Sequence, residues 1–149
     1  NLELLFKGPN LRTFNFNFRF TPRSEDEAFE IKQIIRCFKK NMAVRRSVSN
    51  MFLLTPNIFT LEYIYNSTGE NAGQLHPYLN IFKPMAMTSF NVNYTPDGSY
   101  MTYGDGSLTQ YDVQMSFGEI EPIFSDEYDA NLSGDPDVGA YDQHINMGY

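Results

Sequence analysis

Strict alternation of apolar and polar residues predicts antiparallel β structure in this chain. In the clearest stretch, residues 13–20, Phe occupies every even position and a polar residue every odd one. Successive side chains of a strand point to opposite faces of its sheet, so one face of this strand is expected to be buried. The residues expected on the buried face are Phe14, Phe16, Phe18 and Phe20.

Helical spacing replaces the alternation over residues 24–42. Ser24 and Glu27 have the spacing of a capping box, and Lys39 and Lys40 stand where cations complement the dipole at a helix C-terminus. An apolar stripe recurs at intervals of three and four residues. We expect this stripe to pack on the Phe-rich strand face, with Ala28, Ile31, Ile35 and Phe38 as its central residues.

Three more strand regions follow the helix. The alternation returns after Phe52, most clearly over residues 59–65, and then over about 78–94 and 111–117. Pro84 predicts a bulge or an edge position in the second of these regions, because proline lacks a backbone N–H. Pro- and Gly-containing turns are expected at residues 95–98 and 103–106. The order predicts an α+β fold, mainly antiparallel β, with one amphipathic helix on the sheet.

Charge separates the chain into two parts. Residues 1–118 carry 11 basic and 10 acidic side chains, whereas residues 119–149 carry eight acidic ones and no Lys or Arg. We expect a β domain over residues 1–124 and an extended acidic arm over 125–149. Because phosphate binding needs clustered Lys and Arg, this distribution argues against a primary nucleic-acid grip.

Cysteine content and hydropathy limit the class of protein further. The single Cys37 excludes an internal disulfide and suits a reducing compartment. No stretch of about 18 apolar residues is present, so no membrane span is expected. The sequence begins at Asn1 rather than Met, and we therefore expect it to be a piece of a longer chain.

The residue types that carry catalysis do not form a convincing site, so we expect no catalytic, cofactor-binding or metal site. His76 and His144 lack a second ligand at metal-binding spacing. Cys37 is expected in the core or on the helix flank, and the glycine-rich residues 103–107 precede a strand rather than a phosphate-binding helix. The carboxylates of the arm miss the EF-hand spacing. Glu119 and Glu121 share a strand face without an evident pocket.

Basic residues gather on and around the helix. A solvated face that docks on an acidic partner is favoured over nucleic-acid binding, because no stacking aromatics interleave with the charges. These residues are Arg23, Lys32, Arg36, Lys39, Lys40, Arg45 and Arg46.

Several segments together carry a family resemblance. They are LRTFNFNF at 11–18, PRS at 22–24, IIRCFK at 34–39, FKPMAMT at 82–88, NVNYTPDG at 91–98, YDVQMSF at 111–117 and EIEP at 119–122. Over about residues 2–124 the chain resembles the baseplate tail-tube junction proteins of T4-like contractile-tailed phages. The general plan is also similar to phage tail-tube and type VI secretion tube proteins.

This resemblance implies a barrel-like β-sandwich that strands outside this sequence and neighbouring subunits would complete. It implies a homohexameric ring that contacts the tail-tube protein, a second junction protein, the baseplate hub and the tape-measure protein. DNA would cross the central channel without sequence-specific binding. The expected location is the virion tail, assembled in the host cytoplasm. The residues expected near the channel wall are Asn15, Asn17, Asn91, Asn93, Asp112 and Gln114.

Two other classes of function stay open. A glycan- or cell-wall-binding β module of a phage tail would need exposed aromatics along a groove, which Tyr100, Tyr103 and Tyr111 could supply. A hydrolase of the puncturing device would depend on carboxylates such as Glu119 and is disfavoured.

Overall fold

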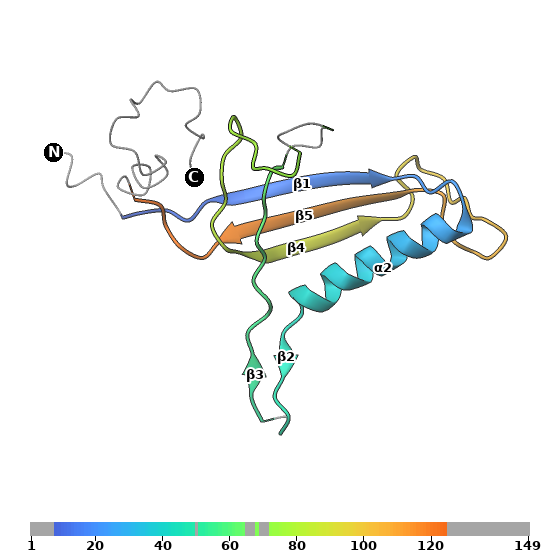
Figure 1. Ribbon diagram of the computed structural model, residues 1–149. Helices are drawn as coiled ribbons and strands as arrows, with labels where there is room; N and C mark the ends of the chain where they lie inside the picture. Colours follow the sequence, from blue (N-terminus) through green and yellow to red (C-terminus); the bar gives the residue numbers. More distant parts are fainter. Residues whose placement is uncertain (1–7, 50, 65–67, 69–71, 125–149) are drawn as a thin grey trace. The chain divides into compact units, whose positions relative to one another are not determined.

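The computed structural model describes residues 8–49, 51–64, 68 and 72–124 (Figure 1). The chain divides into two compact units. The sheet unit comprises Thr13–Ile58 and Ala86–Gly118. The loop unit comprises, among the described residues, 8–12, the described part of Phe59–Met85, and 119–124. The expected acidic arm lies outside the described residues.

Three strands form the main sheet in the order β1–β5–β4, with β1 at Thr13–Phe20, β5 at Tyr111–Glu119 and β4 at Met85–Asn93. β1 pairs antiparallel with β5, in a register that runs from Thr13 opposite Gly118 to Phe20 opposite Tyr111. The arrows in Figure 1 show that β4 also runs opposite to β5. The expected α+β fold with mainly antiparallel strands is therefore confirmed, and the described strands form an open sheet rather than a closed barrel.

Helix α2 spans Glu25–Met42, as its capping and periodicity predict. The Ser24 hydroxyl accepts a hydrogen bond from the Glu27 N–H at 3.3 Å. The Glu27 carboxylate in turn accepts the Arg23 N–H at 2.7 Å, one residue before the usual partner in a capping box. Two donors at the start of the helix are thus satisfied by side chains.

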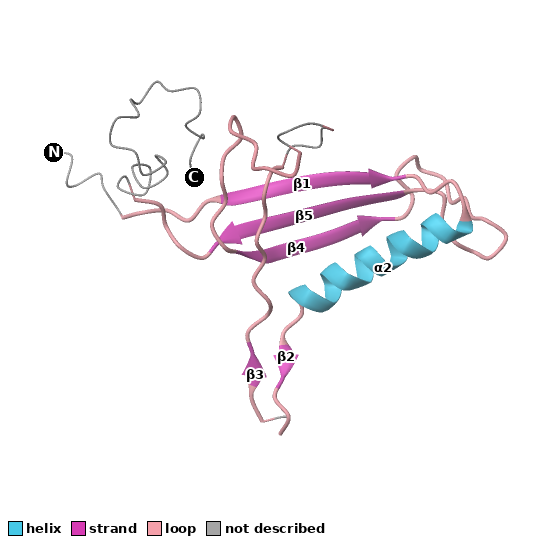
Figure 2. Ribbon diagram, in the orientation of Figure 1, coloured by secondary structure: helices cyan, strands magenta, loops and turns pink. Residues whose placement is uncertain are grey.

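A short antiparallel hairpin follows the helix. β2 is Arg45–Arg46 and β3 is Leu53–Leu54, with Arg45 opposite Leu54 and Arg46 opposite Leu53. Figures 1 and 2 show these two narrow strands beyond the end of α2. All four residues are exposed.

The prediction of a strand over residues 59–65 is wrong for the described residues 59–64. Burial does alternate there, with the odd residues half-buried and the even ones exposed. Among the described residues only isolated bridges form, from Phe59 to Met85 and from Ile64 to Leu75, and no described strand runs beside the segment. The alternation of apolar and polar residues here therefore corresponds to a half-buried extended segment and not to a strand in a hydrogen-bonded β-ladder.

The strand region expected at about 78–94 is shorter than predicted, since β4 begins at Met85, directly after Pro84. Met85 and Met87 are buried and Thr88 is exposed, whereas Phe90 packs on the helix. The inward positions thus move from odd to even numbers along the strand. Such a change of phase is what one extra residue in a bulge produces.

Both predicted turns form at the end of the sheet. In the first, the Gly98 N–H donates to the Thr95 carbonyl oxygen at 3.0 Å, and Gly98 adopts a φ of 76° that favours glycine. In the second, the Asp105 carboxylate accepts hydrogen bonds from the N–H and the hydroxyl of Ser107, at 2.9 and 2.6 Å. The glycine-rich segment is a turn before β5.

Candidate assembly interface

The face of the sheet that packs on the helix is aromatic and aliphatic. The register places Phe14, Phe16, Phe18 and Phe20 directly opposite Phe117, Met115, Val113 and Tyr111, so these eight side chains share one face. On the helix Ala28, Ile31 and Ile35 are buried, while Phe38 is half-buried and stacks on Phe90 with ring centroids 5.7 Å apart.

Burial on β1 is less complete than the sequence indicates. Phe14, Phe16 and Phe20 are half-buried, and Phe18 is 48% exposed. Phe18 lies on the helix side of the sheet, as expected, but it is less buried than the alternation indicates. The helix contributes Ile34, Ile35 and Phe38 to the wall of an apolar cavity that Phe18 also lines, so the covering of this strand is partial.

The opposite face is polar along all three strands. Register pairs Asn15 with Ser116 and Asn17 with Gln114, and the Ser116 hydroxyl donates to the Asn15 side-chain oxygen at 2.6 Å. On β4 the exposed residues Asn91 and Asn93 alternate with the half-buried residues Phe90 and Val92, so they lie on the face opposite Phe90. The structure thus brings the six residues expected at the channel wall onto one face; that this face lines a channel stays a prediction.

Arg19 is the cation of this polar face, and sequence reasoning did not single it out. Its guanidinium donates two hydrogen bonds to the Asp112 carboxylate, at 2.8 and 3.1 Å, and lies 3.6 Å from an Asp97 oxygen. The hydrogen bond from Arg19 holds the pKa of Asp112 below its usual value, and the same bond raises the pKa of Arg19. The cation is therefore matched by carboxylates rather than offered to phosphate.

The Asp112 carboxylate makes stability depend on pH in a predictable direction. A carboxyl whose pKa is lower in the folded state than in the unfolded state stabilises the fold above its ordinary pKa, and this contribution disappears as pH falls through the lowered value. We expect Asp112→Asn to lower the urea midpoint at pH 6 and to have much less effect at pH 3. An equal effect at both pH values would contradict the pairing.

The outer edge of β1 has backbone donors that can be located from the register. The Glu119 N–H donates to the Arg12 carbonyl oxygen at 2.9 Å, and hydrogen-bonded pairs of an antiparallel ladder alternate. Even-numbered β1 residues therefore direct their N–H groups to β5. The N–H groups of Asn15 and Asn17 consequently point to the open edge, beyond which the structure describes no further strand.

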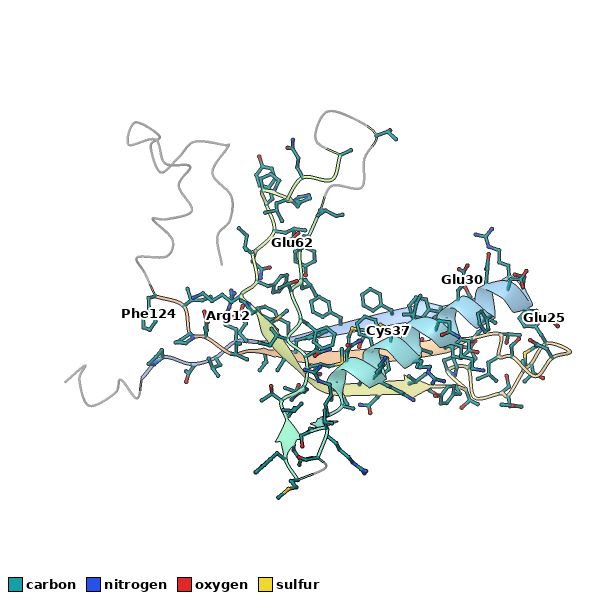
Figure 3. The ribbon with its side chains drawn as sticks, turned by 60° about the horizontal axis from the view of Figure 1, so that its bottom comes forward. Arg12, Glu25, Glu30, Cys37, Glu62 and Phe124 are labelled. Carbon is teal, nitrogen blue, oxygen red and sulfur yellow. The ribbon has the colours of Figure 1, made fainter. Side chains whose placement is uncertain are left out.

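The loop unit holds a buried ion pair. Glu119 is 2% exposed, and its carboxylate accepts two hydrogen bonds from the Arg12 guanidinium, at 2.9 and 2.6 Å, and one from the Lys83 N–H at 3.1 Å. Arg12 also donates to the Ile81 carbonyl oxygen at 3.2 Å. Figure 3 labels Arg12 beside the segment that ends at Phe124. With its oxygens engaged in this way, Glu119 acts as a structural anchor.

The other described residues considered for chemistry have non-catalytic contacts of their own. The His76 ring contacts the ring of Tyr78, and the backbone N–H of His76 donates to the Tyr63 carbonyl oxygen at 2.8 Å. Cys37 is exposed on the helix, with its sulfur 3.4 Å from the Asn41 amide nitrogen. Among the described residues no group of three metal-binding side chains forms, and no helix is long and apolar enough to cross a membrane. His144 lies outside the described residues.

A mixed polar and aromatic pocket of about 410 Å³ lies between α2 and the loop before β5. Tyr100 and Tyr111 line it, as does Tyr94, which sequence reasoning missed. Tyr103 does not line this pocket, since its hydroxyl donates to the Pro22 carbonyl oxygen at 2.6 Å. The remaining polar and apolar lining comes from Glu25, Ala28, Phe29, Lys32, Ile35, Asp105, Gly106, Ser107 and Leu108.

Comparisons with known proteins leave the family open. A scan of protein families gives no match, and a search of curated proteins gives none either. The strand edges, the polar face and the pocket are therefore the features from which a function can be inferred.

Proposed function

We propose that this chain is a structural subunit of a phage tail baseplate, and that it assembles into a hexameric ring joining the baseplate hub to the tail tube. The observation that carries the proposal is the open sheet of the described residues, whose outer strands β1 and β4 are eight and nine residues long and of which only Met85, at the start of β4, is bridged to another described segment. Long exposed edges invite pairing with another chain, and a ring satisfies them without leaving an end. The six-fold symmetry comes from the sequence resemblance.

The directions of β1 and β4 determine how neighbouring copies of the ring can pair through their strand edges. β1 and β4 both run opposite to β5, so they run in the same direction as each other (Figure 1). In a cyclic assembly every copy keeps that direction around the axis. If the β1 of one copy pairs directly with the β4 of the next, this joint is therefore parallel, whereas pairing within each copy is antiparallel.

The polar face would line the channel of such a ring. Its amides and hydroxyls are wettable, and its Arg19 is already bonded to Asp112, so the wall would let DNA pass without holding its phosphates. The opposite face is covered by α2 and would lie on the outside. The ring would initiate the tail tube and contact the tube protein, a second junction protein and the tape-measure protein, and it acts by assembly rather than by catalysis.

Blocking the outer edge of β1 should prevent ring formation without unfolding the subunit. Asn17→Pro removes an N–H that points away from β5, and proline is tolerated on an edge strand in that orientation. We expect the variant to keep its circular dichroism spectrum and to lose the rings. Negative-stain electron microscopy of the chain with its tail neighbours provides the measurement.

Asn17→Ala is the matched control, because it removes the same side chain but keeps the N–H. This variant should still form six-fold rings. If the unaltered chain yields only monomers under these conditions, or if Asn17→Pro forms normal rings, the proposed edge joint is wrong.

The aromatic pocket favours a second candidate function, that of a glycan-binding module of the tail. Tyrosine rings stack on the C–H faces of sugars, and Lys32, Glu25 and Asp105 could bond hydroxyl groups at the same pocket. Tyr100 is 71% exposed and therefore accessible to a ligand.

This candidate predicts that Tyr100→Ala abolishes binding to bacterial cell-wall glycans while the melting temperature stays unchanged. Tyr78→Ala is the control, because Tyr78 is 65% exposed and belongs to the loop unit. A glycan array and a cell-wall pull-down are the measurements. Absence of binding by the unaltered chain, or equal losses in both variants, would remove this candidate.

A further inference from the structure

The β2–β3 hairpin exposes an unusual amount of apolar surface. Phe52 is 69% exposed and Leu53 is 75% exposed, although both are residues that normally bury their side chains. Single exposed apolar residues need no explanation, but several within one short segment point to an interaction site. The exposed apolar residues of this segment are Val44, Val48, Met51, Phe52, Leu53 and Leu54, and we call them the hairpin tip.

An apolar pocket of about 240 Å³ lies between one flank of α2 and the sheet. Ile34 on its rim is 41% exposed and Phe18 is 48% exposed, so the pocket is reachable from outside. No polar residue from the described part of the chain lines it. Its lining is Phe18, Phe20, Ile34, Ile35, Phe38, Phe90, Val113 and Met115.

Charges beside the two surfaces are complementary. Arg46 stands opposite Leu53 and Arg45 opposite Leu54, so an arginine accompanies a leucine on each face of the hairpin. Glu30, labelled on α2 in Figure 3, lies four residues before Ile34 and therefore shares a flank of the helix with this pocket residue. In the described part of the chain, Arg45, Arg46 and Glu30 form no ion pair.

We propose that the hairpin tip of one copy inserts into the apolar pocket of a second copy, with Arg45 or Arg46 placed near Glu30 of that copy. The donor and the receiving surface are different parts of one chain, so the contact is head-to-tail and suits a ring or a stack rather than a closed pair. This inference rests on the proposed self-assembly, and it adds a second contact besides the pairing of strand edges.

A second copy fits better than an unrelated partner, because the chain itself carries both halves of the contact. The tip is apolar and flanked by arginines, and the pocket is apolar and flanked by a carboxylate. Insertion would bury one or two of the tip side chains, such as Phe52, and fill the pocket, and both effects favour association. Arginine at the rim would add orientation more than affinity.

Disulfide trapping tests the contact, since two cysteines join only when their Cα atoms come within about 7 Å. Native Cys37 is exposed and follows Ile34 by three residues, so it lies on the flank of the pocket. A tip chain carrying Met51→Cys and Cys37→Ser is mixed with a chain that keeps Cys37. Both chains also carry Asn17→Pro, which removes the edge joint from the result.

We expect a disulfide-linked dimer on non-reducing gels, with mass spectrometry identifying the bond between position 51 and Cys37. Phe52→Ser in the tip chain, or Ile34→Glu in the receiving chain, should abolish the dimer; both residues are already exposed, so each variant should fold. A receiving chain with Arg36→Cys and Cys37→Ser is the control. Its thiol lies two residues beyond Ile34, on the opposite side of the helix, and should give no dimer.

Absence of the cross-link overturns the inference, as does equal cross-linking at position 36 or insensitivity to Phe52→Ser and Ile34→Glu. Six-fold rings from chains without Asn17→Pro, together with no trapping, would leave the ring proposal standing and reject the hairpin contact alone. Trapping without rings would support the contact and reject the ring.

Discussion

Replacing Val113 by aspartate is expected to prevent the sheet unit from folding. Val113 is 2% exposed on the central strand, opposite Phe18, and it lines the apolar pocket with Ile35 of the helix. An unpaired carboxylate at this position costs several kcal/mol, a large part of the roughly 5–15 kcal/mol that stabilises a typical domain. Circular dichroism and thermal unfolding are the measurements, and we expect no cooperative transition.

The neighbouring residue provides the control. Gln114 is exposed on the polar face, opposite Asn17, so Gln114→Asp adds the same carboxylate to the same strand in water. Its effect on the free energy of unfolding should stay within about 0.5 kcal/mol. A folded Val113→Asp protein with an unchanged melting temperature would show that the inner and outer faces of β5 are assigned the wrong way round.

Glu119→Ala is expected to cost about 3–5 kcal/mol of stability, because removing one member of a buried ion pair leaves the other charge uncompensated. Arg12 is 29% exposed at its side chain, so water reaches part of it and the lower end of that range applies. The Lys83 N–H would lose its acceptor as well. Urea unfolding monitored by fluorescence and circular dichroism measures the loss.

A double-mutant cycle separates the ion pair from the rest of the site. Arg12→Met combined with Glu119→Leu should be less destabilising than the sum of the two single changes, because no charge is left buried alone. Recovery should be incomplete, since the Lys83 N–H and the Ile81 carbonyl oxygen each lose a partner. Additive single effects would show that Arg12 and Glu119 do not interact.

The same position discriminates between a structural and a hydrolytic role. A catalytic carboxylate can be replaced by glutamine with loss of activity and little loss of stability. Glu119→Gln should instead lower stability, because the charged, two-pronged hydrogen bond to Arg12 becomes weaker. Cell-wall hydrolysis that disappears in a fully stable Glu119→Gln protein would reverse this assignment.

Local signals were sufficient for β1, α2 and the two turns. In each case the structure is determined by residues within about one turn or one strand of each other. Ser24 caps the helix, Phe recurs at every second position of β1, and Gly98 adopts a positive φ. The polar face was predictable for the same reason, since alternation alone assigns Asn17 and Gln114 to the side away from the Phe residues.

Properties that depend on distant partners were not predictable. Residues 59–64 alternate in burial as a strand does. Whether they form a ladder depends on the segments beside them, and the described residues give them only isolated bridges. The ion pair between Arg12 and Glu119 joins residues that are 107 positions apart in the sequence, and no local sequence pattern predicts it. The partial exposure of Phe18 likewise depends on where the helix axis lies over the sheet.

The strand order also sets the time at which the sheet can form. β5, the last strand in the described part of the sequence, lies between β1 and β4, so β1 cannot pair with it until about 100 further residues have been synthesised. Contacts of such large sequence separation form slowly, because the chain loses entropy before it gains them. During synthesis, β1 must therefore remain without its sheet partner until β5 has left the ribosome. The three described strands therefore become one sheet only late in synthesis, after β5 has been made.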